Sequence, residues 1–179
     1  LAIGAIYRKR LIDGFGGLLQ DLGSFSVRGA QGRLGLNLAI AFLPAAIFGF
    51  LFHHTITTYL FRPVTVAITL ITGGVAILLI ERRTSEDTRM ITLETMSTSD
   101  ALVVGLAQVL SLIPGTSRSA ATIMGGMLRG IKRAAATDFS FLLAFPVMIA
   151  ASAFDLIKHR ELLTHDLVGL IAVGFITSF

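Results

Sequence analysis

The stretch that decides the fold is ALVVGLAQVLSLIPGTSRSAATIMGGML, residues 101–128. Two apolar segments, 101–113 and 120–128, flank a break at Pro114 and Gly115. Each segment is shorter than the roughly 20 residues that a helix needs to cross a bilayer. Paired half-length apolar helices around such a break are typical of a re-entrant hairpin. We therefore predict a re-entrant helical hairpin over about 101–128.

The composition of the whole chain fits a membrane. Of its 179 residues, 54% are apolar and 15% are charged, and the mean hydropathy is +0.79. Soluble domains carry about 25% charged residues, and disordered chains combine low apolar content with high charge, so neither class fits. Five windows lack charged side chains: 34–61, 63–80, 101–117, 139–154 and 167–179. Since none alternates apolar and polar residues, we predict an all-α, polytopic membrane protein.

Complete spans are expected over 34–52, 63–80 and about 137–154, with Thr137 and Asp138 opening the last one. The Gly-rich region 8–33 is expected to be a loop with at most a short interfacial helix. A cap at Ser99 or Asp100 is expected to start the helix that follows.

The basic residues suggest a topology. Lys and Arg number five in 8–33, one in 53–62, three in 81–100, three in 129–133 and two in 155–166. If 101–128 re-enters, the loops alternate as the positive-inside rule requires, with 8–33 and 81–133 cytoplasmic. Both ends of the chain are apolar, as if each were part of a span. We expect residues 1–179 to be a single integral membrane domain belonging to a longer protein.

Arg118 is the residue most in need of an explanation. A guanidinium within apolar half-helices is costly and marks a functional site by default. It requires an anion or a carboxylate, and Asp138 is the nearest carboxylate in sequence within the apolar region. The alternative is structural: Arg118 snorkels to the interface or pairs with a helix C-terminus.

The surroundings of Arg118 suit phosphate. The break exposes backbone N–H groups, and the next half-helix points its positive N-terminus at them. Hydroxyls and a guanidinium complete a set of donors that can hold phosphate oxygens. The candidate binding residues are Gly115, Thr116, Ser117, Arg118, Ser119 and Thr122. Ser and Thr also pack membrane helices together, so this alternative stays open.

The run LAQVLSLIPGTSRSAATIMGGMLRGIKRAAATDFSFLLAFPVMIAA resembles the signature of the undecaprenyl-diphosphate phosphatases, known as bacitracin-resistance proteins. The pieces YRKRL, NLAIAFLPAAIFGFLF and GGVAILLIERR are similar to that family in order and spacing, so the resemblance covers nearly the whole chain. Its PGxSRSxxT motif is specific. This chain has Ala120 where members usually carry Gly.

The resemblance implies a bacterial plasma-membrane enzyme that hydrolyses undecaprenyl diphosphate to undecaprenyl phosphate, which recycles a cell-wall carrier lipid and confers bacitracin resistance. It implies an inverted repeat with two re-entrant hairpins, and catalytic roles for Arg118 and Ser117. It also implies a divalent cation, Mg²⁺ or Ca²⁺, held by ligands outside this chain. A homodimer is a further expectation, and no nucleic-acid partner is expected.

One departure concerns the family's other catalytic half, an (E/Q)xxxE motif in the first hairpin. No Glu or Gln is followed four residues later by Glu in these 179 residues. We therefore expect that hairpin upstream of Leu1, and this chain alone to be inactive.

Two other classes of function stay open. Broken helices and inverted repeats also serve anion or lipid transporters, and an inactive membrane fragment is the third alternative. The chain has no Cys, which excludes disulfides and thiolate metal sites. The pair His53 and His54 reads as an interfacial feature, and we predict no metal ligands in this sequence.

Overall fold

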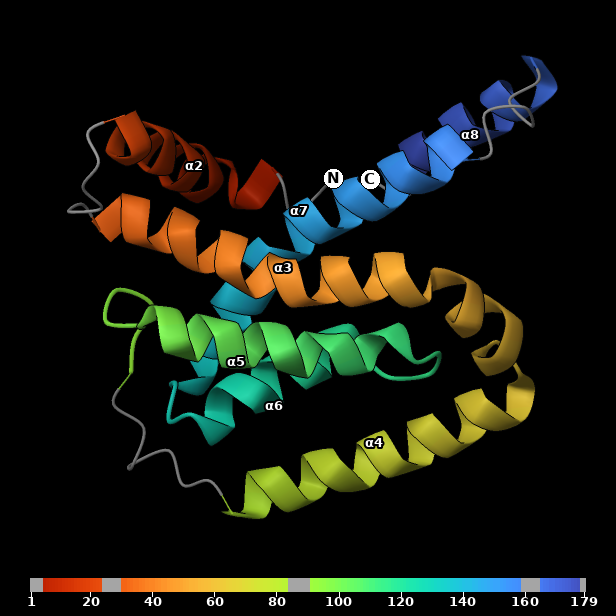
Figure 1. The fold of residues 1–179 in the computed structure, drawn as a ribbon, viewed down its shortest axis with the longest axis horizontal. Coiled ribbons are helices and arrows are strands. Elements are labelled where there is room, and N and C mark those ends of the chain that lie inside the picture. Colours follow the sequence, from red (N-terminus) through yellow and green to blue (C-terminus); the bar gives the residue numbers. More distant parts are fainter. Residues whose placement is uncertain (1–4, 24–29, 84–90, 159–164, 178–179) are drawn as a thin grey trace.

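The computed structural model describes residues 5–23, 30–83, 91–158 and 165–177. Within these ranges the regular elements are helices, together with one isolated parallel bridge between Ile91 and Ile131. Figure 1 shows long helices arranged around a short pair, α5 and α6. The all-α fold class is confirmed.

The helices have the following bounds, in chain order. They are α2 (Arg8–Gly23), α3 (Ala30–Thr55), the π-helix η1 (Ile56–Leu60), α4 (Pro63–Arg83), α5 (Thr98–Val109), the 3₁₀-helix η3 (Leu110–Leu112), α6 (Arg118–Leu128), α7 (Arg133–Lys158) and α8 (His165–Thr177). Three helical segments are long and apolar enough to cross a membrane: Gly32–Leu60, Pro63–Arg83 and Arg133–Lys158. They match the three expected spans and confirm a polytopic membrane protein.

Helices α5 and α6 form a hairpin that packs between α3 and α7 because small residues let the backbones approach closely. A Cβ atom placed on Gly105 of α5 would lie 2.5 Å from the carbonyl oxygen of Ala41 in α3. One placed on Gly125 of α6 would lie 2.5 Å from the Cβ atom of Ala107. Close packing here continues into a buried core that includes Leu38, Val104, Phe139, Leu142 and Leu143. These close contacts fix the position of the hairpin relative to α3 and α7.

The hairpin runs alongside α4 from near the C-terminal end of that helix to a point within its length. At the hairpin's base, Arg133 forms an ion pair with Glu81, near the end of α4. At its tip, the Thr69 hydroxyl donates to the carbonyl of Pro114 across 2.6 Å. Thr69 and Glu81 are twelve positions apart, or about 18 Å along a helix, against about 30 Å for the hydrocarbon core of a bilayer. The tip thus lies well inside the length of α4, and the chain then returns to the base.

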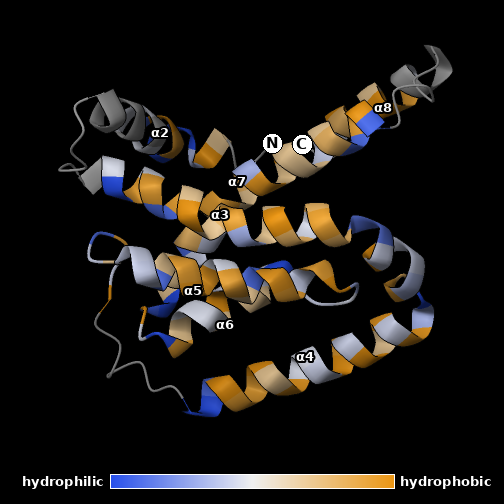
Figure 2. Ribbon diagram, viewed as in Figure 1, coloured by the Kyte–Doolittle hydropathy of each residue, from blue (hydrophilic) through white to orange (hydrophobic). Residues whose placement is uncertain are grey.

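The other ends of the long helices meet on the opposite side. Lys158 Nζ at the end of α7 lies 2.6 Å from His53 Nε2 near the end of α3. Figure 2 shows hydrophilic colour gathered at the helix ends and hydrophobic colour along their shafts. The polar helix ends therefore fall into two groups. One holds 81–83 and 129–133, and the other holds 53–62 and Lys158. The alternation of basic loops in the sequence predicts the same two groups.

The predicted loop over 8–33 is wrong for most of its length. Residues 8–23 form α2, and α3 already begins at Ala30, while 24–29 lie outside the described residues. Glycine disfavours a helix by about 1 kcal/mol per residue, but tertiary contacts outweigh that cost. Leu11 is 5% exposed in the core, and α2 packs along α3 (Figure 1).

The close approach of α5 and α3 leads to a first prediction. Replacing Gly105 with Ala should destabilise the protein by about 1–3 kcal/mol, because the clash is with backbone that cannot rotate away. Thermal unfolding in detergent measures the loss. Gly74→Ala on α4 is the matched control, since a Cβ there meets nothing within 4 Å. Equal melting temperatures for the two variants would contradict the packing described here.

Candidate anion-binding site

The loop 113–117 turns sharply because Gly115 adopts a left-handed conformation, with φ of 93°. The N–H of Thr116 closes the turn on the carbonyl of Ile113 at 3.1 Å. A Cβ atom on Gly115 would lie 2.7 Å from the carbonyl oxygen of Val66 in α4. Only glycine satisfies both the backbone angle and the close approach, so the break in the sequence corresponds to a turn held against α4.

Ser117 caps the helix that follows the turn. Its φ and ψ are extended, and its hydroxyl accepts a hydrogen bond from the N–H of Ala120 at 3.3 Å. The Ser119 hydroxyl lies 3.3 Å from the hydroxyl of Ser117. Ala120 lies within the first turn of α6, where its helical backbone needs no glycine. The departure from the family pattern at this position is therefore accommodated.

Arg118 is the first residue of α6, and its side chain is half-buried. The guanidinium donates a hydrogen bond from Nη1 to the backbone carbonyl of Ser140 at 3.0 Å. The ion pairs formed by the described residues do not include Arg118. A neutral carbonyl in mid-helix orients the guanidinium without neutralising it, and a guanidinium has five N–H donors. Arg118 is therefore a candidate for binding an anion, since no carboxylate of the described residues pairs with it.

Asp138 does not provide that anion. Its two carboxylate oxygens accept hydrogen bonds from the Tyr7 hydroxyl at 2.8 Å and from Arg10 at 2.9 Å. The bond to Asp138 raises the pKa of the Tyr7 phenol. The expectation that Asp138 caps a helix is also wrong, because α7 begins five residues earlier, at Arg133. Tyr7 and Arg10 lie near the start of the chain, 131 and 128 positions from Asp138. The sequence around Asp138 therefore gave no sign of these contacts.

Thr122 turns away from the loop and into the protein. It is fully buried, and its hydroxyl lies 2.7 Å from that of Ser140 and 3.1 Å from the carbonyl oxygens of Arg118 and Ser119. Ser140 thus holds both Arg118 and Thr122, a role that sequence inspection missed because Ser140 lies in another helix. The structure gathers Gly115, Thr116, Ser117, Arg118 and Ser119 at the tip, with Thr122 supporting them from behind.

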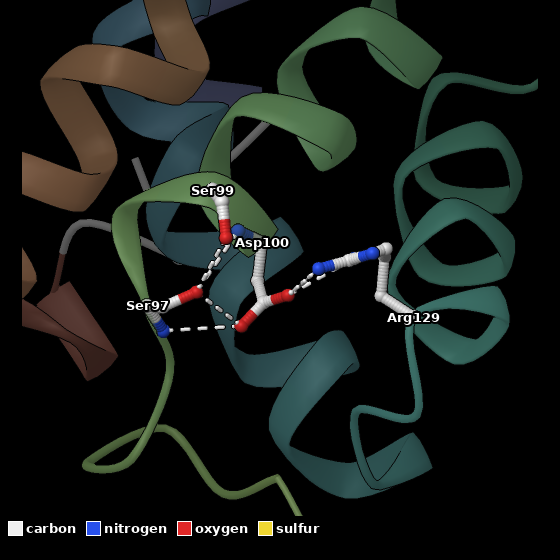
Figure 3. A network of polar contacts seen from close by, with 4 residues as sticks. All are labelled: Ser97, Ser99, Asp100 and Arg129. Carbon is white, nitrogen blue, oxygen red and sulfur yellow. Dashed lines mark hydrogen bonds and ion pairs between the residues drawn. The ribbon is translucent and has the colours of Figure 1, made fainter.

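The base of the hairpin is closed by a second polar network (Figure 3). Ser97, and not Ser99 or Asp100, is the N-cap of α5, and Asp100 completes a capping box with it. The Asp100 carboxylate also accepts from Arg129 at 2.9 Å. Burial alone raises the pKa of Asp100, but the hydrogen bonds from Ser97 and Arg129 outweigh burial and hold that pKa below its ordinary value. This network fixes where α6 ends relative to where α5 begins.

The Asp100 network predicts a pH dependence. A carboxylate whose pKa is lower in the folded than in the unfolded protein stabilises the fold above its unfolded pKa, near 4. Asp100→Asn should therefore cost about 1–3 kcal/mol at pH 7. The difference from wild type should shrink as the pH falls below about 4. Melting temperatures in detergent between pH 7 and pH 3 check this, and a deficit independent of pH would contradict it.

The turn at the tip generates another prediction. Gly115→Ala should destabilise the protein by at least about 1–2 kcal/mol, the cost of a left-handed residue with a side chain, and displace Arg118. The neighbouring change Ala120→Gly is the control, expected to cost about 0.5–1 kcal/mol as in any helix. Thermal unfolding measures both, and a Gly115→Ala protein as stable as the wild type would show that the turn is not required.

The donors at the tip do not fit a divalent cation. They are a guanidinium, hydroxyls and backbone groups, whereas Mg²⁺ and Ca²⁺ take oxygen ligands that include carboxylates. Among the described residues no group of three or more His, Asp or Glu side chains could hold a metal ion. The same donors do suit a phosphate, whose oxygens accept from hydroxyls and from Arg.

The hairpin of α5 and α6 places Arg118, which has no carboxylate partner in the described ranges, next to apolar helices long enough to span a membrane. This arrangement defines a polytopic membrane protein with a candidate anion site. The chain belongs to the family described as bacitracin resistance protein BacA, whose family model matches residues 1–179.

Several curated relatives are similar along the whole chain. Undecaprenyl-diphosphatase from Neisseria meningitidis serogroup C is 47% identical over 180 residues, and the protein of the same name from Nitrosomonas europaea is 50% identical over 179 residues. Undecaprenyl-diphosphatase 2 from Rhodospirillum rubrum is 49% identical over 179 residues. All of this chain aligns in each case, yet it spans only 62–63% of those relatives' lengths.

Proposed function

We propose that this chain forms the phosphate-binding part of an undecaprenyl-diphosphate phosphatase. Such an enzyme releases inorganic phosphate from undecaprenyl diphosphate and so contributes to bacitracin resistance. The observation that carries the proposal is Arg118, a half-buried guanidinium that contacts the neutral carbonyl of Ser140. Membership of the BacA family and relatives named undecaprenyl-diphosphatase support it.

Charge stabilisation is the chemistry that this site can supply. In hydrolysis, the oxygen of water bonds to the terminal phosphorus while the bond from that phosphorus to the bridging oxygen breaks. Negative charge spreads over the phosphoryl oxygens in the transition state, and positioning with electrostatic stabilisation lowers the barrier. Arg118 can hold two of those oxygens at once, and Ser117 and the N-terminus of α6 lie next to it. We assign catalytic roles to Arg118 and Ser117.

The hairpin gives this chemistry a membrane setting. Its tip lies about 18 Å along α4 from its base, beside helices that are long and apolar enough to span. We propose that α5 and α6 re-enter the bilayer and that a second such hairpin, from an inverted repeat, completes the site. A diphosphate joined to an apolar chain can reach such a tip from the lipid.

Further parts of the proposal rest on the family resemblance. They are a location in the bacterial plasma membrane, a homodimer, and a divalent cation, Mg²⁺ or Ca²⁺, whose ligands come from outside the described residues.

Substitution of Arg118 tests the function. With the protein expressed from its complete gene, Arg118→Ala should lower phosphate release from undecaprenyl diphosphate at least about 100-fold, as losses of electrostatic transition-state donors do. Arg118→Lys should recover only part of the rate, because an ammonium lacks the two-pronged geometry. Inorganic phosphate released in detergent micelles is the measurement.

The matched control is Arg82→Ala, at the exposed end of α4, which should keep wild-type turnover. Normal turnover of Arg118→Ala would overturn the role of Arg118. Anion uptake into proteoliposomes by a wild-type protein that releases no phosphate would favour a transporter instead.

A further inference from the structure

A large apolar cavity lies between α3, η1, the end of α5 with η3, and α7. Its volume is about 890 Å³, within the range of small-molecule binding pockets. Its walls are mostly aromatic and aliphatic, including Phe42, Phe50, Leu112, Val147 and Phe154. Along α7 the lining extends from Val147 to Lys158, eleven positions or about 16 Å. The cavity is therefore elongated and suits a chain-like apolar ligand.

Polar side chains occur at the two ends of this cavity. Gln108 and Ser111 line the end next to the hairpin tip, and Leu112 leads from there into the loop 113–117. The opposite end is lined by His53 and Lys158, whose side-chain nitrogens lie 2.6 Å apart, and by the carboxylate residue Asp155. The end of the cavity next to the hairpin tip is thus lined by a residue with an uncharged amide, ten positions before Arg118 in the sequence.

Gln108 is the unexplained residue. It is 1% exposed, and neither the nitrogen nor the oxygen of its side-chain amide has a hydrogen-bond partner among the residues that the structure describes. The Ser111 hydroxyl donates to the backbone carbonyl of Gln108 at 2.6 Å, so this bond does not involve the side-chain amide. Asn37, the other buried amide with an unpaired atom, at least donates to the carbonyl of Met96 at 3.0 Å. A buried amide with no partner is costly unless a bound molecule supplies one.

We infer that Gln108 is a substrate-binding residue whose amide hydrogen-bonds a phosphate of an isoprenyl phosphate or diphosphate, while the first isoprene units of that lipid lie against the apolar walls of the cavity. The inference rests on the proposed function and adds a specificity residue outside the PGxSRSxxT motif. The amide N–H₂ donates to phosphate oxygens, and its carbonyl accepts from a protonated oxygen or a bound water.

The form of the cavity favours a lipid over a soluble anion. Its Phe, Leu and Val side chains pack against hydrocarbon and give an inorganic anion no polar contact, and Lys158 lies at the end of the cavity opposite to Gln108. A neutral amide is also less costly to bury in the empty protein than an ammonium or guanidinium. Gln108 can therefore add selectivity for the polar head without introducing a second buried charge.

Gln108→Met tests the inference because it keeps length and apolar volume while removing both polar atoms. In the protein expressed from its complete gene, it should raise KM for undecaprenyl diphosphate about tenfold, equivalent to about 1.4 kcal/mol, and change kcat little. The Kd for undecaprenyl phosphate should rise by a similar factor, and the Kd for undecaprenol, which lacks phosphate, should not change. Gln108→Glu should weaken binding of the phosphate further by charge repulsion.

Asn37→Leu is the matched control, a buried amide that does not line the cavity. It should lower the melting temperature and leave KM unchanged, whereas Gln108→Met should keep or raise the melting temperature. An unchanged KM and Kd in Gln108→Met would overturn the inference, because the amide would then contribute nothing to binding of the lipid phosphate. Equal weakening toward undecaprenol would overturn it as well, because the effect would then be apolar packing.

The same measurements separate this inference from the proposed function. A wild-type protein that releases no phosphate from undecaprenyl diphosphate would remove the proposed function. Binding of undecaprenyl phosphate that still depends on Gln108 would then support a lipid-phosphate site without hydrolysis. Wild-type hydrolysis with no dependence on Gln108 would remove only the inference.

Discussion

The structure depends on a guanidinium that is oriented but not neutralised. Arg118 donates to the carbonyl of Ser140 in α7, and the ion pairs of the described residues use other carboxylates. In an apolar layer, a positive charge without a counterion is a strong and selective attraction for a phosphate. Placing Arg118 for such a contact requires the hairpin of α5 and α6, a turn that exposes the start of α6, and neighbouring helices that do not supply an acid.

Small residues and terminal ion pairs meet these requirements. Gly105 and Gly125 allow the hairpin to sit against its neighbours, and Gly115 holds the tip against α4. At the base of the hairpin, Arg129 forms an ion pair with Asp100, and Arg133 forms one with Glu81. The basic cluster after α6 therefore joins helices together, in addition to any effect on topology.

Much of the fold and part of the site were accessible from the sequence. Charge-free apolar windows identified the three spans because apolar length alone decides whether a helix can cross a bilayer. The Pro114-Gly115 break identified the hairpin because no regular helix accommodates it. The helix over 8–23 was missed because its stability comes from α3 and from Asp138, not from its own Gly-rich sequence.

The sequence by itself determined that the chain is a helical membrane protein, where it turns, and which arginine lies at the turn, since these follow from local apolarity and backbone chemistry. Only the tertiary structure decided which partners the polar side chains find. Asp138 pairs with Tyr7 and Arg10, Thr122 contacts Ser140, and the buried Gln108 amide has no hydrogen-bond partner among the described residues. The reason is that hydrogen bonds between helices depend on how the helices pack, and that geometry is a property of the whole chain.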